Sequence, residues 1–571
     1  MIKLPISSYR CAFLAIVATL AASVAAIAAQ EPESAAPIAV VSLAGYDQWH
    51  ENVAMIGELS GSPDLAQGLE AMLKIATANQ GLAGLDKTRP WVAALIPVGP
   101  LFTAYVCLPV DDLDALLDVV RPLTANISTD RGVYKITLSG GQAVYVARRG
   151  DWAVVALDPA TIGRAPADPL ALAGELPKKY DVAVRLHVAR VPQTLRDLIL
   201  AQVDGVVAEQ AVRRPGEDEA THAGRRTAGR LASGMTKTAL TEMDEVTVGL
   251  VLDRSVRRLT AEVLLTPKEG TSVARRWSEY ADRAPDESIA PQLRDAATVN
   301  FCSWSCVLSQ PARNALQATL DTFRAEALRD VERSARPERS ELDRRLALSL
   351  FDLADNLPTS ERFEGHVGLI PRGDRMAVVA AVGMEPSERR TAQAEQLAAA
   401  LAECYPGVNV GVETVEDRHG KVRLQRLSRP ISEVTQVAED REMLTRWFGD
   451  ELELTFGIGT RHLYFAGGYD GRNALKRILA ASRAAEGTTA PRPLECSWAL
   501  TEGLRVIASL TDRSAEDAIV RDTAVLEQSP GKDHIRLSAE PAERGIRISL
   551  ELEEGVLRLI APVLGTLGAG Y

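Results

Sequence analysis

The sequence contains little cysteine and few aromatic residues for its length. Its 571 residues include six cysteines, and phenylalanine, tryptophan and tyrosine together make up 5%. Small secreted scaffolds depend on disulfides because they bury little apolar surface, whereas a chain of this length has enough residues for at least two cores. We therefore expect packing to hold the fold. Five cysteines lie beyond residue 29, so at most two disulfides form and none is required.

The sequence also lacks a basic patch with interleaved aromatic residues. Its formal net charge is −12, and the charge becomes −14 without Lys3 and Arg10, because residues 1–28 contain no acidic residue. A negatively charged surface has no electrostatic attraction for phosphate backbones. The composition therefore excludes nucleic acid as an expected partner.

None of the common catalytic or nucleotide-binding motifs occurs in the sequence. There is no G-x-x-x-x-G-K-[ST] phosphate loop, no G-x-S-x-G nucleophile elbow and no H-E-x-x-H zinc motif. The histidines are not spaced like pairs of metal ligands, and we interpret them as structural or surface residues: His50, His187, His222, His366, His419, His462 and His534. The sequence thus predicts no catalytic, cofactor-binding or metal-binding residue and no cofactor. An enzyme with an unrecognised site is the alternative.

Residues 1–29 have the pattern of a secretory signal. Two basic residues supply positive charge, an uncharged apolar run extends from Cys11 to Ala28, and a polar segment follows. Cleavage near Ala28 or Ala29 is the first expectation, and an uncleaved membrane anchor is the alternative. No later stretch reaches the roughly 18 apolar residues of a spanning helix. We therefore expect an exported chain, periplasmic or extracellular, that contacts the membrane only through this segment, if the segment is retained.

Internal repeats organise the remaining sequence. Residues 192–269 align without gaps with residues 311–388, and both segments contain a Val-Gly-Leu triplet at the same place (248–250 and 367–369). Apolar periodicity predicts the same order in each copy: a short strand, a charged helical stretch, a β-hairpin and a second helix. Shared features in one register over so many residues indicate a duplicated unit.

Related segments near both ends of the chain extend this repeat. A three-stranded meander at 133–157 follows the first unit, and a related meander at 453–468 follows the third unit. The order unit, meander, unit therefore occurs in residues 30–295 and again in residues 296–571. The sequence predicts an α+β fold of two tandem duplicated domains, each a mainly antiparallel sheet with helices on one face.

A charged helical-hairpin insert is predicted in each domain, at residues 195–243 and 314–357. The turns of the two hairpins are strongly charged, and helices of about 20 residues would extend roughly 30 Å. A solvated helix pair that shields one sheet face is the preferred interpretation. The alternative is an arm that docks a partner.

Residues 138–142 spell Leu-Ser-Gly-Gly-Gln, the signature peptide of ABC-type ATPases. The peptide lies between two alternating apolar segments, and its glycines accept the positive φ of a tight turn. Because the sequence has no phosphate loop, we interpret these residues as a hairpin turn and expect no bound nucleotide.

In two of the repeats, a cysteine and a tryptophan two positions apart point to the same face of a predicted strand. Cys302-Ser-Trp304 recurs as Cys496-Ser-Trp498. A shared core layer is the preferred interpretation, and a Cys302–Cys496 disulfide between neighbouring strands is the alternative. Cys306 lies four residues beyond Cys302, about 13 Å along a strand, which is too far for a shared zinc ion or a disulfide.

Two other conspicuous patterns have structural explanations. Arg-Gly-Asp at 149–151 and at 372–374 falls on predicted hairpin turns, where glycine and aspartate are typical. The acidic residues in 110–114 and Asp470 precede helical segments, where carboxylates cap free N–H groups and meet the positive end of the helix dipole.

These patterns resemble those of a class of large exported bacterial proteins of unknown function. In that class, too, a signal segment precedes a stretch similar to residues 90–120 and a meander similar to residues 132–159. The resemblance implies the repeated α+β architecture and no particular activity.

The leading functional hypothesis is a non-catalytic exported protein that binds a protein partner or scaffolds an assembly of the cell envelope or surface. The first alternative is a periplasmic carrier of an apolar ligand or lipid, because large apolar pockets form where sheets and helices diverge. The second alternative is an envelope hydrolase without a recognisable motif. A polar constellation inside the predicted core would favour the hydrolase, and the sequence shows none.

Overall fold

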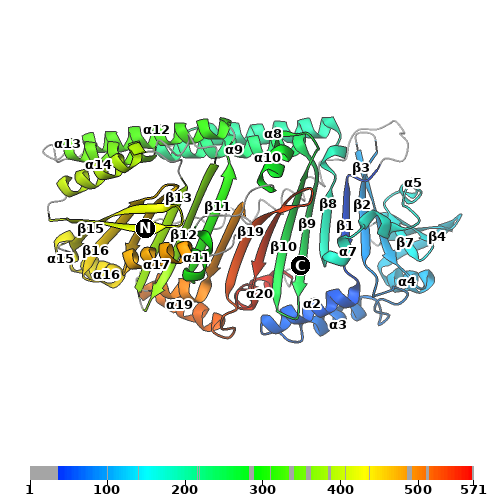
Figure 1. Cartoon of the computed structure of the whole chain (residues 1–571). Helices are drawn as coiled ribbons and strands as arrows, with labels where there is room; N and C mark the ends of the chain where they lie inside the picture. The colour runs from blue at the N-terminus through cyan, green and yellow to red at the C-terminus, as the bar shows by residue number, and fades with distance from the viewer. Residues whose placement is uncertain are drawn as a thin grey trace. The chain divides into compact units, whose positions relative to one another are not determined.

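A computed structural model describes residues 36–568 with gaps at 99–100, 139–140, 215–216, 218, 282–288, 309, 334–339, 355–361, 374, 384–387, 405–406, 436, 485–491 and 509–512. The chain forms two compact units, and Figure 1 labels their helices and strands. The first consists mainly of residues 36–255 and 261–271, and the second of residues 256–260 and 272–562. The predicted signal segment, residues 1–29, lies outside the described residues.

An antiparallel sheet forms the framework of the first unit. Its strands are β1 (Ala39–Leu43), β2 (Trp91–Val98), β3 (Leu101–Pro109), β4 (Thr124–Asp130), β5 (Val133–Leu138), β6 (Ala143–Arg149), β7 (Trp152–Ala156), β8 (Val182–Leu186), β9 (Met243–Asp253) and β10 (Arg258–Pro267). Their spatial order is β4-β5-β6-β7-β3-β2-β1-β8-β9-β10.

The second unit also contains an antiparallel sheet. Its strands are β11 (Asn300–Val307), β12 (Arg362–Arg372), β13 (Arg375–Gly383), β14 (Asn409–Asp417), β15 (Gly420–Pro430), β16 (Glu451–Ile458), β17 (His462–Gly468), β18 (Leu494–Ala499), β19 (His534–Ala542) and β20 (Gly545–Leu552). Their order is β14-β15-β16-β17-β13-β12-β11-β18-β19-β20. In the order along the chain, β1 to β10 occupy the same places in the first sheet as β11 to β20 in the second.

Short helices close one face of the first sheet, which we call its core face. The helices of this unit are α2 (Tyr46–Leu59), α3 (Leu65–Ala76), α4 (Leu113–Val120), α5 (Pro159–Ile162), α6 (Pro169–Ala173), α7 (Leu176–Lys179), α8 (Gln193–Ala211) and α9 (Glu219–Glu242). Val92, Cys107 and Val154 are fully buried on the core face. Leu113 and Leu117 of α4 pack on the adjoining meander. The pair α8 and α9 is joined by a hydrogen bond from Ser233 to Asp204 of 2.9 Å.

The core face of the second sheet is covered chiefly by two helices. The helices of this unit are α10 (Ser272–Ala281), α11 (Ala290–Ala296), α12 (Gln310–Arg333), α13 (Ser340–Ala354), α14 (Glu388–Cys404), α15 (Ile431–Val434), α16 (Ala438–Phe448), α17 (Gly471–Ala484), α18 (Leu500–Ala508) and α19 (Arg513–Leu526), with α20 (Glu554–Gly568) after β20. Leu293 of α11 and Leu475 and Leu479 of α17 pack with Val379 and Tyr464 of the sheet in one buried cluster.

Helices lie on both faces of the second sheet, and the expectation of helices on one face is wrong there. Leu397 of α14 and Leu346 of α13 pack against Leu463, whose side chain points away from that of Tyr464 because neighbouring residues of a strand alternate. The reason is that β17 carries apolar side chains on both faces, so each face requires a cover.

The structure confirms the predicted α+β class with large antiparallel sheets, and it confirms the predicted hairpins. The segments on either side of Asp253 form β9 and β10, and those on either side of Gly373 form β12 and β13. Each predicted meander has additional strands: β4 in the first unit, and β14 and β15 in the second. Among the described residues, no helix is both long enough and apolar enough to cross a membrane.

Candidate functional site

A group of buried and half-buried polar side chains lies on the core face of the second sheet. We call it the histidine cluster, and it comprises Ser303, Glu364, His366, Asp417, His419, His462 and Tyr464. His366 and His462 are 2% and 3% exposed, and Tyr464 is fully buried. Buried polar groups destabilise a core unless they are paired, so the arrangement of these side chains requires an explanation.

His462 and Glu364 reach each other across strand β13. His462 Nε2 lies 2.9 Å from Glu364 Oε1, and the residue between them on the sheet is Gly383, directly opposite His462. A Cβ at Gly383 would lie 2.2 Å from Glu364 Cγ. Glycine therefore provides the space in which the carboxylate approaches the imidazole.

His366 is oriented by a neighbour on β11. Ser303 is directly opposite His366 in the β11–β12 pairing, and Ser303 Oγ lies 2.9 Å from His366 Nδ1. The rings of His366 and His462 are 6.2 Å apart between centroids. One carboxylate oxygen of Glu364 and one nitrogen of each of these histidines all lie within 4.8 Å of one another.

Tyr464 and Asp417 border the two histidines. The Tyr464 hydroxyl donates a 2.7 Å hydrogen bond to Asp417, and the backbone N–H of His419 donates one of 2.7 Å to the other oxygen of that carboxylate. Burial, and then the negative charge of Asp417, raises the pKa of Tyr464 far above its ordinary value. Tyr464 therefore keeps its proton and acts as a fixed donor, while the ring of His419 stacks on that of His462 at 6.2 Å.

The positions of the first sheet that correspond to His366 and Tyr464 are apolar. His366 is opposite Ala381, which is opposite Tyr464, and in the first unit Val92 is opposite Cys107, which is opposite Val154. All three residues of the first unit are fully buried. Ser42, opposite Val92, is a buried polar counterpart of Ser303, but the same sheet order closes its core with apolar residues at the places of His366 and Tyr464, so these two polar residues are not a requirement of the fold.

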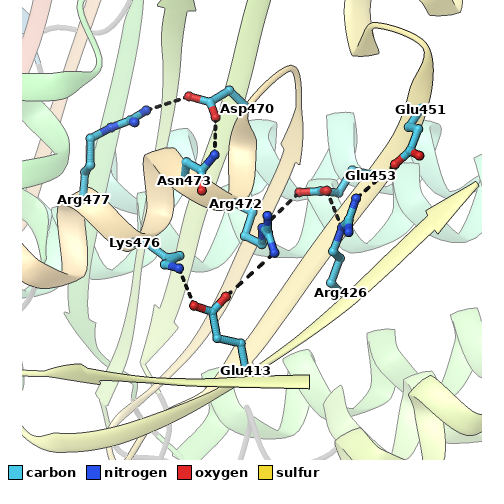
Figure 2. Close-up of polar contacts among 9 residues, drawn as sticks. All are labelled: Glu413, Arg426, Glu451, Glu453, Asp470, Arg472, Asn473, Lys476 and Arg477. Carbon is cyan, nitrogen blue, oxygen red and sulfur yellow. Dashed lines mark hydrogen bonds and ion pairs between the residues drawn. The ribbon is translucent and has the colours of Figure 1, made fainter. Parts of the chain in front are cut away.

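A network of ion pairs joins the N-terminal half of α17 to neighbouring strands (Figure 2). Arg472 and Lys476 of α17 pair with Glu413 of β14, and Arg472 also approaches Glu453 of β16 at 3.7 Å. Neighbouring pairs join Arg426 to Glu451 and Glu453, and Asp470 to Asn473 and Arg477. These side chains are partly exposed, so each pair contributes little, and together they fix the position of α17 over β14 to β16.

Strands β11 and β18 are joined by a disulfide between Cys302 and Cys496, which are directly opposite each other. The structure therefore confirms the alternative interpretation of the repeated Cys-Ser-Trp pattern, a disulfide between neighbouring strands. Cys496 is also buried, as the core-layer interpretation requires. Val41 and Val184 are the directly opposite pair at the corresponding place of β1 and β8.

The first sheet has a second apolar face, opposite its core face, which we call the open face. One row of directly opposite residues crosses five strands of this face: Val248, Val184, Val41, Ala93 and Val106. The rows on either side are also apolar and consist of Val246, Leu186, Ala39, Leu95 and Ala104, and of Leu250, Val182, Leu43 and Trp91.

Side chains of the open face are accessible to solvent. Val248 is 42% exposed, Val184 39% and Leu250 38%, and Leu43, Val106 and Leu186 are each 37% exposed. Contiguous exposed apolar surface on a soluble protein marks a place where something binds. The open face is therefore a second candidate functional site.

The second unit contains a groove of about 920 Å³ beside β18, β19 and β20. Its lining is charged and includes the ion pairs Arg294–Glu495 at 2.6 Å and Arg505–Glu527 at 2.9 Å. These charged side chains are paired with one another, and such a lining does not suit an apolar ligand.

Glu553, next to this groove, gives a testable pH dependence. Burial by itself raises the pKa of Glu553, but hydrogen bonds from His534 and Arg536 outweigh burial and bring the pKa to about 2, against an ordinary value of 4.5. A carboxyl with a depressed pKa stabilises the folded state above pH 4.5 and loses this contribution as the pH falls toward 2. We expect Glu553→Gln to lower the free energy of unfolding by about 2 to 3 kcal/mol at pH 7. Urea unfolding at pH 7 and at decreasing pH tests this, since the difference from the unsubstituted protein should shrink below pH 4.5. A difference that is constant with pH would contradict it.

The seven histidines separate into two groups. The structure brings His366, His419 and His462 together in the histidine cluster. His50, His187, His222 and His534 lie apart, and each has its own nearby partner: Glu70, Glu245, the Ala211 carbonyl and Glu553. Sequence spacing did not reveal the cluster, because its residues come from four strands and a turn far apart along the chain.

The turn-forming patterns lie where the sequence places them. Gly141 has a φ of +84°, and its N–H donates to the Leu138 carbonyl in the hairpin that joins β5 to β6, while Ser139 and Gly140 are outside the described residues. Arg149 is opposite Trp152, and Arg372 is opposite Arg375, so both Arg-Gly-Asp copies are hairpin turns, with Asp374 not described.

The acidic residues before α4 cap that helix, as predicted. The Asp112 side chain accepts hydrogen bonds from the backbone N–H groups of Asp114 and Ala115. Asp470, before α17, instead accepts from the side chains of Asn473 and Arg477.

Comparisons with protein-family models, with curated proteins and with solved structures gave no match to this chain.

Proposed function

We propose that the chain is an exported, non-catalytic binding protein that carries a ligand with acyl chains on the open face of its first unit. The observation that supports this proposal is the uninterrupted apolar row from Val248 to Val106 across five neighbouring strands. This is the apolar-ligand carrier among the hypotheses that follow from the sequence.

The chemistry of the open face favours acyl chains over a protein partner. Its most exposed side chains are all leucine and valine. The residues that dominate protein interfaces are tryptophan, tyrosine and arginine, and leucine and valine contribute less often. Covering each of these half-exposed side chains with an apolar chain contributes about 1 kcal/mol. Several such contacts along a flat row suit an extended hydrocarbon.

Tandem duplication of one domain accounts for the two units. The identical strand order supports it, and so does the pattern that places Val41 and Val184 where the second unit has its disulfide cysteines. In this proposal α8 with α9, and α12 with α13, are the charged helical-hairpin inserts of the two domains. Export itself rests on the signal-like pattern of residues 1–29.

Native mass spectrometry of the purified chain tests the proposal. We expect bound mass that organic solvent removes and that fragments as a lipid or a fatty acid. The double variant Val184→Lys, Val248→Lys should lose this mass, because it places two charges in the middle of the open face. Val520→Lys is the matched control, since Val520 is 60% exposed on α19 of the second unit, and it should retain the ligand.

A protein partner is the competing outcome. If the chain carries no extractable mass but co-purifies with a polypeptide that the Val184→Lys, Val248→Lys variant no longer binds, the open face is a docking surface and the carrier proposal is wrong. A bound lipid that both variants retain would place the ligand elsewhere and would also contradict the proposal.

A further inference from the structure

We propose that Glu364, His366 and His462 form a binding site for a transition-metal ion, with Zn²⁺ as its representative. The site belongs to the second unit and the open face to the first, and metal binding does not depend on the proposed carriage of an acyl-chain ligand. Either proposal can therefore fail without the other.

The three side chains have the chemistry and the proximity of a metal-ligand set. Two imidazoles and one carboxylate are common zinc ligands, and one ligand atom of each lies within 4.8 Å of the others. Ligand atoms around a tetrahedral zinc ion are about 3.3 Å apart. The Glu364 and His462 atoms are already 2.9 Å apart, so modest side-chain rotation completes the set. Three protein ligands leave one position for water or an external group.

The surroundings of the ligands resemble the supporting contacts of metal sites. Ser303 Oγ is hydrogen-bonded to Nδ1 of His366, so Nε2 is the nitrogen of that ring that would bind the ion. Such outer contacts fix ring orientation and tautomer. His462 Nε2 faces the Glu364 carboxylate, and coordination of an ion through Nε2 places the proton of the neutral ring on Nδ1. Glu364, with 16% of its side chain exposed, is the ligand closest to solvent.

Two comparisons within the chain distinguish this group from an ordinary buried ion pair. The first unit has apolar residues, Val92 and Val154, at the places of His366 and Tyr464. It also contains a simple His–Glu pair, His187 with Glu245 at 3.2 Å, and within the described residues no third ligand joins that pair. The second unit therefore adds a third ligand, His366, to a His462–Glu364 pair for which Gly383 makes room.

The test uses the full chain after removal of metal with a chelator. Co²⁺ serves as the spectroscopic probe, and Zn²⁺ is titrated in competition with a chromophoric chelator. We expect one Co²⁺ per chain with visible absorption bands of low-symmetry coordination, and one Zn²⁺ that displaces it. His366→Gln and His462→Gln should each weaken Zn²⁺ binding at least 100-fold, and Ser303→Ala about 10-fold.

His187→Gln is the matched control and should bind Zn²⁺ within about 2-fold of the unsubstituted chain. Circular dichroism of each variant establishes that it is folded. If a histidine variant fails to fold, the thermal midpoint of the unsubstituted chain still decides the question, because Zn²⁺ should raise it for that chain and for His187→Gln. The proposal would be overturned if the unsubstituted chain does not bind Co²⁺ and Zn²⁺ stoichiometrically. It would also be overturned if His366→Gln and His462→Gln bind Zn²⁺ as tightly as the unsubstituted chain does.

Discussion

Replacing Cys302 and Cys496 with valine should lower the free energy of unfolding of the second unit by about 3 to 5 kcal/mol. The disulfide closes a loop between residues 194 positions apart, and the entropy that it removes from the unfolded chain grows with loop length. Valine is the replacement of choice because Val41 and Val184 hold the same place between β1 and β8 without a bond. The variant therefore loses the cross-link and keeps an apolar pair.

Urea unfolding with and without a reductant measures this loss. The unsubstituted chain under reducing conditions should match the double variant, and reductant should not change the double variant further. Cys306→Ser is the control, because Cys306 is exposed on the same strand and its replacement should change stability by less than about 0.5 kcal/mol. An unsubstituted chain that is equally stable with and without reductant would contradict the prediction, as would alkylation of both Cys302 and Cys496 before reduction.

Gly468→Ala should destabilise the second unit by about 3 kcal/mol. Gly468 has a φ of +80°, and a Cβ there would lie 2.3 Å from the Met376 carbonyl oxygen. The left-handed conformation alone costs a non-glycine residue about 1 to 2 kcal/mol. The clash adds to this, since the same carbonyl accepts the Tyr469 N–H at the start of the connection to α17 and cannot move without losing that bond.

Gly373→Ala provides the matched comparison for Gly468→Ala. Gly373 has a φ of +68° in the hairpin between β12 and β13, and a Cβ there has no atom within 4 Å. Its replacement should therefore cost only the backbone term, about 1 kcal/mol. Denaturant unfolding of the two variants should separate the clash from the conformation, and equal losses would show that Met376 yields without cost.

Much of the fold follows from the sequence because its local signals are strong. Turn residues such as Gly141 and Gly373 lie between apolar segments, and they predict the hairpins on each side. Of the strands that were missed, β4 is polar, Thr-Ala-Asn-Ile-Ser-Thr-Asp, and β14 exposes most of its residues, so their pairing with β5 and β15 holds them in place. The third, β15, has a short apolar alternation at Val422 and Leu424 among charged residues, which the sequence interpretation did not use.

The histidine cluster was not predictable for a different reason. Ser303, His366 and His462 are separated along the chain by 63 and 96 positions (366 − 303 and 462 − 366), and only the β11–β12–β13–β17 order brings them together. Metal motifs that can be read from sequence place two ligands on one local element, and among the three proposed ligands only Glu364 and His366 are in that relation. A strand spacing of two, with both side chains on one face, was the available signal.

The open face was partly visible in the sequence. The segments of β1, β2 and β3 are nearly continuous apolar runs, which are typical of strands that are covered on both sides. These runs are the signal from which a second apolar face could have been predicted, and they do not show whether the protein itself covers that face. In the first unit Val184 and Val248 remain about two-fifths exposed.

Photo-crosslinking with a fatty acid that carries a diazirine on its acyl chain tests the carrier proposal most directly. After irradiation of the purified chain, proteolysis and mass spectrometry locate the modified residues. We predict adducts on open-face residues of β1, β8 and β9, with Val184 and Val248 among them, and competition by unlabelled fatty acid. Absence of adducts from these strands, or adducts on exposed apolar residues throughout the chain without competition, would contradict the account.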